Sequence, residues 1–455
     1  MVKLDQHTTE EYTGLVIGAL MRQEKDVFRE LFLELHPTDQ LDLFQQFDEL
    51  QKSLVYEYIT PEEFADIFQG METDEQKDTM QELRQEYASE MLSNLYIDDL
   101  ASFLGELEEQ EAHGIIQQLD VEDAKEIKEI LAYDPETAGG IMTTEYVSVF
   151  TTDTAEKVMA QLREETPEAE TIYYLYVVNE QEQLVGVLSL RDLIFSKLDQ
   201  KVEDIMGTRV ISVNVSTDQE EVAQIIQKYD FLAIPVVKDD GRLVGIVTVD
   251  DALDVFEEEL EEDFGEMTGT KGSADANISS FAAAKLRAPW ILILMFLGLI
   301  TAGIIGRFES TLQSVVILAG FMPMVMGSAG NTGTQALAVM VRSLATSQFD
   351  KTAIKQLIRR EFGTGVMLGL ICGIVLLVVI SVVYGNVAVA MVVGFSLFCT
   401  LSVATIIGAT IPLLIDRLKI DPAVASGPFI TTLNDIIGLV IYFSVATMFL
   451  DYLPH

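Results

Sequence analysis

The chain has 455 residues, of which 49% are hydrophobic, and a formal net charge of −43 at pH 7. From Ala276 onward it holds ten Lys/Arg and seven Asp/Glu, a net of +3, which leaves 19 Lys/Arg against 65 Asp/Glu before it, a net of −46. Such an acidic half excludes nucleic acid as a natural partner, because phosphates would be repelled, and it favours divalent cations, although solubility alone also explains acidic surfaces.

Cysteine and histidine usage excludes further classes of protein. Cys372 and Cys399 both lie inside apolar runs, so no disulfide framework is indicated. The four histidines share no metal-ligand spacing, which argues against a zinc site. The first twelve residues lack the apolar core of a signal peptide, so we expect the acidic half to stay in the cytoplasm.

Residues 1–135 predict an acidic, all-α N-domain of superhelical type. Four similar stretches occur, HPTDQLDLFQQF, ITPEEFADIFQGM, YIDDLASFLGEL and LDVEDAKEIKEIL. Each begins with helix-starting residues and acids and continues with apolar residues at helical spacing. Stacked short helices are expected, and the pattern fits either a scaffold or a sensing domain.

Residues 136–202 and 203–256 contain the same pattern twice. IMTTEYVSVF from Ile141 matches IMGTRVISVN from Ile205, and LVGVLSLRDL from Leu184 matches LVGIVTVDDA from Leu243. This duplication of strands and helices resembles a tandem pair of α/β CBS domains. The resemblance implies a cleft that takes ATP or another adenine nucleotide, unless the pair is purely structural; the candidate residues are Tyr174, Ser189, Arg191, Asp192, Phe231 and Thr248.

Residues 257–285 predict an acidic linker, a long plug-like helix followed by a hinge. Acids crowd VDDALDVFEEELEEDF, and no Lys or Arg is interleaved. Like charges one turn apart destabilise a helix, so the segment needs a counter-ion or a basic partner unless it is simply a solvated face. Oxygen ligands alone favour Mg²⁺ or Ca²⁺.

Residues 286–455 predict a transmembrane domain of five helices. The expected spans are Trp290 to about Ile305, Leu312 to beyond Ala338, Gly363 to about Tyr384, Val387 to Leu414 and Ala423 to Leu450. The excess of Lys and Arg in alternate connections predicts a multi-pass protein of the cell (inner) membrane with its C-terminus outside.

Two membrane segments carry polar groups that a lipid anchor would not need. Asp435 is the only charged residue between Ala423 and Leu450, where a carboxylate is expected to face a cavity, a partner or an ion. A protonated Asp bonded to a neighbouring helix is the alternative. In PMVMGSAGNTGTQ we expect Pro323 and the glycines to interrupt the helix and expose carbonyls, although small residues also make packing faces. The pore-lining candidates are Gly330, Asn331, Gln335, Thr431 and Asn434.

The domain order, GNTGTQ and DPAVASGPFITTLND together resemble the MgtE family of magnesium transporters over nearly the whole chain. The resemblance implies a homodimer that imports Mg²⁺ through a pore between the subunits, where Asp435 binds the hydrated ion. It also implies that cytosolic Mg²⁺ closes the pore. The implied gating acids are Asp251, Asp254, Glu259, Glu262, Asp263 and Asp421, with Asp99, Asp218, Glu220 and Asp230 as further candidates. The chain departs from some relatives at Gly427, where they carry Asn.

Two other functions remain open from the sequence. One is a membrane-tethered CBS nucleotide sensor without transport. The other is a broader transporter of Co²⁺, Ni²⁺ or Mn²⁺, or one coupled to Na⁺ or H⁺, because oxygen ligands select ions by size and hydration. No nucleophile–base pair or phosphate loop indicates an enzyme.

Overall fold

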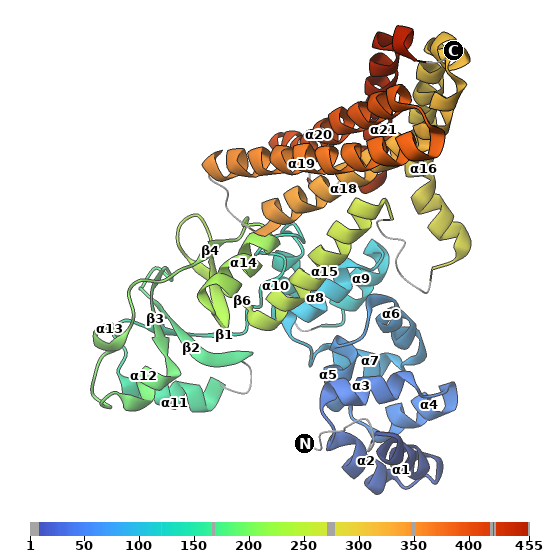
Figure 1. Ribbon diagram of the computed structural model, residues 1–455. Helices are drawn as coiled ribbons and strands as arrows, with labels where there is room; N and C mark the ends of the chain where they lie inside the picture. The colour runs from blue at the N-terminus through green and yellow to red at the C-terminus, as the bar shows by residue number, and fades with distance from the viewer. Residues whose placement is uncertain are drawn as a thin grey trace. The chain divides into compact units, whose positions relative to one another are not determined.

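The computed structural model describes residues 9–119, 121–165, 169–270, 278–346, 351–418, 422 and 425–453. The chain divides into two compact units, Met1–Phe256 and Glu257–His455, which are considered separately below (Figure 1).

Short helices form the first part of unit one, as the four similar stretches predict. The helices are α1 (Thr9–Met21), α2 (Lys25–Leu33), α3 (Pro37–Gln45), α4 (Glu49–Tyr58), α5 (Pro61–Gln69), α6 (Thr73–Glu82), α7 (Gln85–Leu92), α8 (Ile97–Gly105), α9 (Glu109–Ile116) and α10 (Val121–Ile130). The four stretches correspond to α3, α5, α8 and α10. The prediction of a helical N-domain is confirmed.

The start of α5 shows how sequence fixes these helices locally. The Thr60 hydroxyl accepts a hydrogen bond from the Glu63 amide, and the Glu63 carboxylate accepts one from the Thr60 amide, which is a capping box. The same carboxylate accepts two bonds, at 2.8 and 2.6 Å, from Arg29 of α2. Beneath this contact the rings of Phe28, Phe64 and other aromatic residues are fully buried. Polar caps and an aromatic core therefore hold neighbouring helices together.

Two three-stranded sheets of identical topology follow, which confirms the CBS-type duplication. Their strands are β1 (Tyr146–Phe150), β2 (Thr171–Val178) and β3 (Leu184–Ser189), then β4 (Val213–Asn214), β5 (Ala233–Val237) and β6 (Leu243–Thr248). Their helices are α11 (Ala155–Glu165), α12 (Leu190–Phe195), α13 (Val202–Ile205) and α14 (Gln219–Tyr229). In each sheet the middle strand is parallel to the first and antiparallel to the third.

The repeated sequence blocks pair across the two copies rather than within one. Thr143 exchanges backbone hydrogen bonds with Ile246, and Gly207 exchanges them with Val187, all between 2.8 and 3.0 Å. A methyl group on Gly245 of the second copy would collide with Met142 of the first copy. The opening segment of each copy therefore completes the sheet of the other, so the two copies form one structural body.

Unit two is built of long helices joined by a few short helices and turns. They are α15 (Val249–Thr268, which begins in unit one), α16 (Ser280–Arg307), α17 (Glu309–Ser314), the 3₁₀ turn η1 (Val316–Phe321), α18 (Met322–Thr346), α19 (Lys351–Tyr384), α20 (Val387–Arg417), α21 (Gly427–Met448) and the 3₁₀ turn η3 (Leu450–Tyr452). Four of them, α16, α19, α20 and α21, are long and apolar enough to cross a membrane among the described residues.

The second of the five expected spans differs from the other four in its composition. The segment after Leu312 is divided into α17, η1 and α18, and α18 is not among the four apolar helices. The physical reason is the polar run SAGNTGTQ, which lowers its hydropathy.

The expected interruption of this helix is also absent. Pro323 is the second residue of α18, where its missing amide hydrogen costs no intrahelical bond, and the helix continues through Gly327, Gly330 and Gly333. These glycines instead permit close helix packing: a methyl group on Gly333 would collide with the Asn434 amide. The exposed-carbonyl interpretation of the glycines is therefore wrong for this conformation.

Candidate functional site

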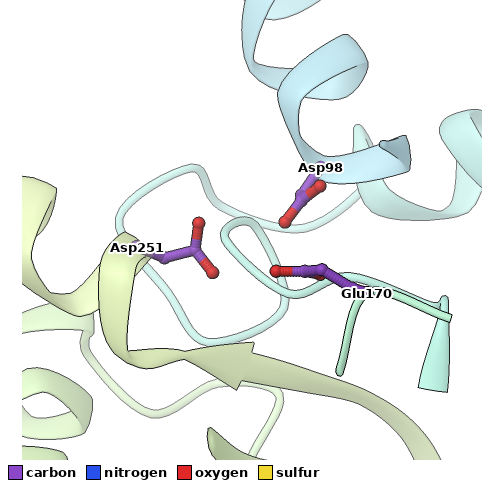
Figure 2. Close-up of side chains that lie close together, drawn as sticks. All are labelled: Asp98, Glu170 and Asp251. Carbon is purple, nitrogen blue, oxygen red and sulfur yellow. The ribbon is translucent and has the colours of Figure 1, made fainter. Parts of the chain in front are cut away.

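Three carboxylates from distant parts of unit one converge on one point. Each of Asp98, Glu170 and Asp251 offers an oxygen within 4.8 Å of the oxygens offered by the other two. Figure 2 shows the three side chains pointing toward one another, from α8, from the residue before β2, and from the first turn of α15. We call this group the acidic triad.

Local structure holds two members of the triad at helix starts. The amide of Asp99 donates to Asp98 Oδ1 at 2.9 Å in the first turn of α8. The amide and hydroxyl of Thr248 donate to Asp251 Oδ2 at 3.1 and 2.5 Å, at the junction of β6 and α15. Carboxylates are favoured at helix N-termini because unpaired amides and the helix dipole face them. This explains each aspartate separately but not their convergence.

The third member does not lie at a helix start, although its carboxyl group is hydrogen-bonded to the Thr143 side chain. Glu170 precedes β2, and its Oε2 atom is buried with no hydrogen-bond partner among the described residues. A buried polar atom without a partner costs about 1–3 kcal/mol, and a charged one costs more. The triad therefore contains an oxygen that lacks a positively charged or hydrogen-bonding neighbour.

Burial and mutual repulsion raise the pKa values of the whole cluster. Burial raises the pKa of Glu170 to about 8, with repulsion from Asp251 as the next cause. The same two causes raise the pKa of Asp98 well above its usual range and that of Asp99 to about 7. Burial also raises the pKa of Asp251, against the hydrogen bonds from Thr248. The cluster thus disfavours its own ionised form unless a cation is present.

The donor set fits a hard divalent cation. It consists of carboxylate oxygens, with no thiol or imidazole, which suits Mg²⁺ or Ca²⁺ rather than softer metals. Asp98, Glu170 and Asp251 would hold such an ion, which would supply the positive charge that the buried carboxylates lack.

We expect the stabilisation of the chain by Mg²⁺ to depend on pH. Without a cation, the raised pKa values mean that the folded state binds protons more tightly than the unfolded state. Stability should therefore fall as pH rises from about 4 to about 8.

Mg²⁺ at 100 times its dissociation constant should raise the free energy of unfolding by about 2.7 kcal/mol at pH 8. The rise should be much smaller at pH 5.5, where protons compete with Mg²⁺ for the carboxylates. Melting curves of the full chain with Mg²⁺ and with EDTA at both pH values would measure this; an equal Mg²⁺ effect at both would contradict it.

Two triad members were not predicted from the sequence. Asp251 and Asp99 were candidates, but Asp98 and Glu170 were not. The signal for Asp98 was its position in YIDD beside Asp99, and the helix phase decides which of the two enters the triad. No sequence signal marked Glu170.

The other predicted gating acids lie outside the triad, although Asp254 is close enough for its charge to raise the pKa of Asp99 and Asp251. Asp254, Glu259, Glu262 and Asp263 follow along α15. Asp218 accepts from the Glu220 amide as the N-cap of α14, and Asp230 ends that helix in a left-handed conformation (φ 54°). The positions of Asp218 and Asp230 at the two ends of α14 therefore give each residue a structural role that does not require an ion. Asp421 lies outside the described residues.

The predicted nucleotide residues lie at equivalent turns of the two CBS copies. Ser189 joins β3 to α12 and donates to Asp192 at 2.7 Å, as Thr248 does to Asp251 in the second copy. Asp192 and Arg191 are exposed, and Tyr174 pairs with Ser189 across β2 and β3. Phe231 stacks on Tyr229 with ring centroids 5.5 Å apart. The two copies thus differ: Asp251 belongs to the triad, whereas Asp192 faces solvent.

In unit two, Asp435 of α21 faces α18 at a glycine. A methyl group on Gly330 would lie 3.3 Å from Asp435 Oδ1 and would collide with Thr431. The Thr431 and Thr334 hydroxyls are hydrogen-bonded at 3.1 Å. Asp435 Oδ1 is buried and has no hydrogen-bond partner among the described residues. The alternative of an Asp bonded to a neighbouring helix therefore finds no support at this oxygen.

The remaining pore-lining candidates divide into two groups. Asn331 and Gln335, one turn apart on α18, are exposed. Asn434 is only 1% exposed and packs against Gly333 within unit two. An exposed polar face on a helix among membrane-spanning helices is expected to meet water or another protein surface, because lipid cannot satisfy it. Asn331 and Gln335 are therefore expected to contact water or another protein surface, whereas the buried Asn434 is not.

The carboxyl end of α15 packs at the start of α21. The Met267 side chain packs with Leu337, Val341 and Ile430, and a methyl group on Gly427 would lie 3.2 Å from the Met267 carbonyl oxygen. The acidic helix therefore ends against α18 and α21.

Comparison with known proteins identifies the family. The family described as MgtE, divalent cation transporter, matches residues 322–445, the MgtE intracellular N domain matches 35–136, and the CBS domain matches 138–199 and 202–258. The magnesium transporter MgtE of Enterococcus faecalis is 45% identical over 445 residues, covering 97% of this chain and 98% of the relative. The chain belongs to the MgtE family of magnesium transporters.

Two further MgtE relatives match all or most of the chain. The magnesium transporter MgtE of Bacillus subtilis is 41% identical over 449 residues, covering 98% of this chain and 100% of the relative. That of Thermus thermophilus is 43% identical over 331 residues, covering 72% and 73%. The predictions of a transporter family and of a protein that is not an enzyme are confirmed.

Two solved structures match the acidic half. The soluble part of a magnesium transporter is 45% identical with a TM-score of 0.53, covering 55% of this chain and 99% of that chain. The cytosolic domain of the Mg²⁺ channel MgtE in complex with ATP is 38% identical with a TM-score of 0.51, covering 53% and 99%. MgtE cytosolic domains therefore share the fold of unit one.

Proposed function

We propose that this chain is a Mg²⁺-selective channel of the cell membrane whose pore lies at the axis of a homodimer, with Asp435 as the ion ligand. The observation that carries the proposal is Asp435 itself, whose buried Oδ1 lacks a partner among the described residues beside an exposed polar face of α18. A second copy would bring a second Asp435 to the axis and cover Asn331 and Gln335. Mg²⁺ releases water reluctantly, so two carboxylates would hold it as a hydrated ion.

The acidic triad is the proposed sensor of cytosolic Mg²⁺. Its carboxylates come from the helical domain, from the first CBS copy and from α15, so an ion bound there would hold all three segments together. Without the ion they repel one another. Mg²⁺ binding therefore shifts the population toward the closed arrangement, in which the three segments are held together. The size of the shift is set by how much more tightly this arrangement binds Mg²⁺ than the open one does. Asp254, Glu259, Glu262, Asp263 and Asp421 would extend this ion-dependent contact along α15 and to the pore entrance.

The end of α15 is the proposed gate. Gly427 has no side chain, which allows the Met267 carbonyl to approach the start of α21. In this conformation the helix end would block the cytoplasmic entrance. When Mg²⁺ leaves the triad, α15 would be free to move away.

A second proposed function is adenine-nucleotide binding by the CBS pair. The ATP complex of the MgtE cytosolic domain, which is 38% identical, favours it. The exposed Asp192 and Arg191, beside the Tyr174–Ser189 strand pair, suit ribose and phosphate. Thr248 and Phe231 would complete the cleft.

Mg²⁺ flux into vesicles that contain the reconstituted full chain tests the channel proposal. We expect uptake down the Mg²⁺ gradient, and a fall in uptake as Mg²⁺ rises on the side of the acidic half. Absence of flux would overturn the channel. Flux that does not respond to Mg²⁺ on that side would support the channel proposal but overturn the proposal that the acidic triad senses Mg²⁺. Uptake that requires a Na⁺ or H⁺ gradient would replace the channel by a coupled transporter.

A further inference from the structure

The first turns of α19 carry two cations without acidic partners. Lys355 and Arg359 lie one helical turn apart and are exposed, and no ion pair or hydrogen bond involves either side chain among the described residues. The neighbouring Arg360 differs, because it pairs with the buried Glu361 at 3.0 Å. In a chain with 72 acidic and 29 basic residues, two adjacent cations that pair with none of the described carboxylates require an explanation.

Helix length places these cations beyond the hydrocarbon core. The 34 residues of α19 extend roughly 51 Å, whereas the core is about 30 Å thick. The exposed aromatic residues Phe362 and Tyr384 are separated by a rise of roughly 33 Å, which matches that thickness. Arg359 lies about one turn before Phe362, and Lys355 lies about two. Both therefore lie at the depth of lipid headgroups.

The orientation of the helix directs the cations away from the protein. Leu357, on the opposite face, packs with Met340 and Leu413 of the neighbouring helices. Lys355, Arg359 and Phe362 follow i, i+4, i+7 spacing and share one exposed face. That face continues into exposed apolar side chains of the same helix, such as Leu370. The resulting order is cation, aromatic ring, then apolar surface, which complements the order of phosphate, glycerol region and acyl chains along an anionic phospholipid.

We propose that Lys355 and Arg359 bind the phosphate headgroup of an anionic phospholipid, whose acyl chain lies along the apolar face of α19. Charge complementarity carries the assignment: a guanidinium binds phosphate oxygens through two hydrogen bonds, and Lys adds a point charge. The acidic half, with its net charge of −46, would be repelled by an anionic leaflet, so this cationic face offsets that repulsion where the chain meets the membrane. The site is separate from the pore and does not depend on the channel proposal.

The experiment uses the full chain in vesicles of mixed phosphatidylglycerol and phosphatidylcholine, followed by mild extraction and counting of bound lipids by mass spectrometry. We expect enrichment of phosphatidylglycerol on the unmodified chain. Each cation near an anionic surface contributes a factor of about 5, so Lys355→Gln with Arg359→Gln should lower the enrichment by up to about 25-fold. Lys355→Arg should preserve it.

Arg307→Gln is the matched control, because it removes one exposed cation at the carboxyl end of α16, on the other membrane face in the proposed topology. Elution profile and melting temperature should be unchanged in every variant, since neither Lys355 nor Arg359 has a partner within the described part of the chain. Equal enrichment in the double variant and the unmodified chain would overturn the proposal, as would an unmodified chain that does not prefer phosphatidylglycerol.

Discussion

Replacing Asp435 with Asn should reduce Mg²⁺ flux at least 100-fold while the protein still assembles. The change preserves side-chain size and removes one carboxylate from each subunit. At an effective dielectric constant of about 20, a divalent ion about 5 Å from one carboxylate gains roughly 7 kcal/mol before its lost hydration is counted. Even a third of that energy corresponds to a loss of about 50-fold per carboxylate. Flux of Mg²⁺ into vesicles with the reconstituted variant is the measurement.

Asp451→Asn provides the matched control for Asp435→Asn. Asp451 is an exposed carboxylate in η3, after the end of α21, so its loss changes the net charge equally without touching α18. We expect flux close to that of the unmodified chain. Undiminished flux in Asp435→Asn would remove Asp435 from the pore, and the packing interpretation of this residue would then stand.

Replacing Asp98 and Asp251 together with Asn should raise the cytosolic Mg²⁺ concentration needed for half-inhibition by tenfold or more. Both lost groups are carboxylates of the acidic triad, so an ion there would keep only Glu170. The midpoint depends on how much more tightly Mg²⁺ binds the closed state than the open state. A tenfold shift corresponds to a loss of about 1.4 kcal/mol from this difference in binding free energy, and the loss of two charged ligands should exceed that value. Flux measured against Mg²⁺ on the side of the acidic half reports the midpoint.

The duplication supplies a control for this second prediction. Asp192 occupies the position in the first CBS copy that Asp251 occupies in the second, and each accepts hydrogen bonds from the hydroxyl three residues earlier. Asp192→Asn removes the carboxylate that accepts this hydroxyl bond but removes no triad ligand. Measured without nucleotide, it should leave the midpoint unchanged. A double variant with an unchanged midpoint would show that the triad does not sense Mg²⁺.

The sequence predicted those features that depend on neighbouring residues. The stretches such as ITPEEFADIFQ carry their own caps, acids and apolar spacing, so the helices of the first domain could be located. The repeated LVG and IM blocks identified the CBS pair, and the apolar runs located α16, α19, α20 and α21. Asp435 was found because a single acid in an apolar run is visible without a structure.

The second membrane segment shows where local reasoning failed. Gly and Pro lower helix propensity in isolation, which predicted an interrupted backbone around Gly330. In the folded chain the same glycines let α21 approach closely, and the packing energy gained keeps α18 continuous from Met322 to Thr346. Tertiary contacts thus overrode propensity.

By itself, the sequence determined the order of domains, the acidic and apolar halves, the duplication and the residue types that suit a hard divalent cation. Only the tertiary structure decided that Asp98, Glu170 and Asp251 meet, although 72 residues separate the first two and 81 the last two. The physical reason is that helix caps and periodicity act over a few residues. Convergence of three carboxylates instead depends on how whole domains pack, and on which of two neighbouring aspartates the phase of α8 turns inward.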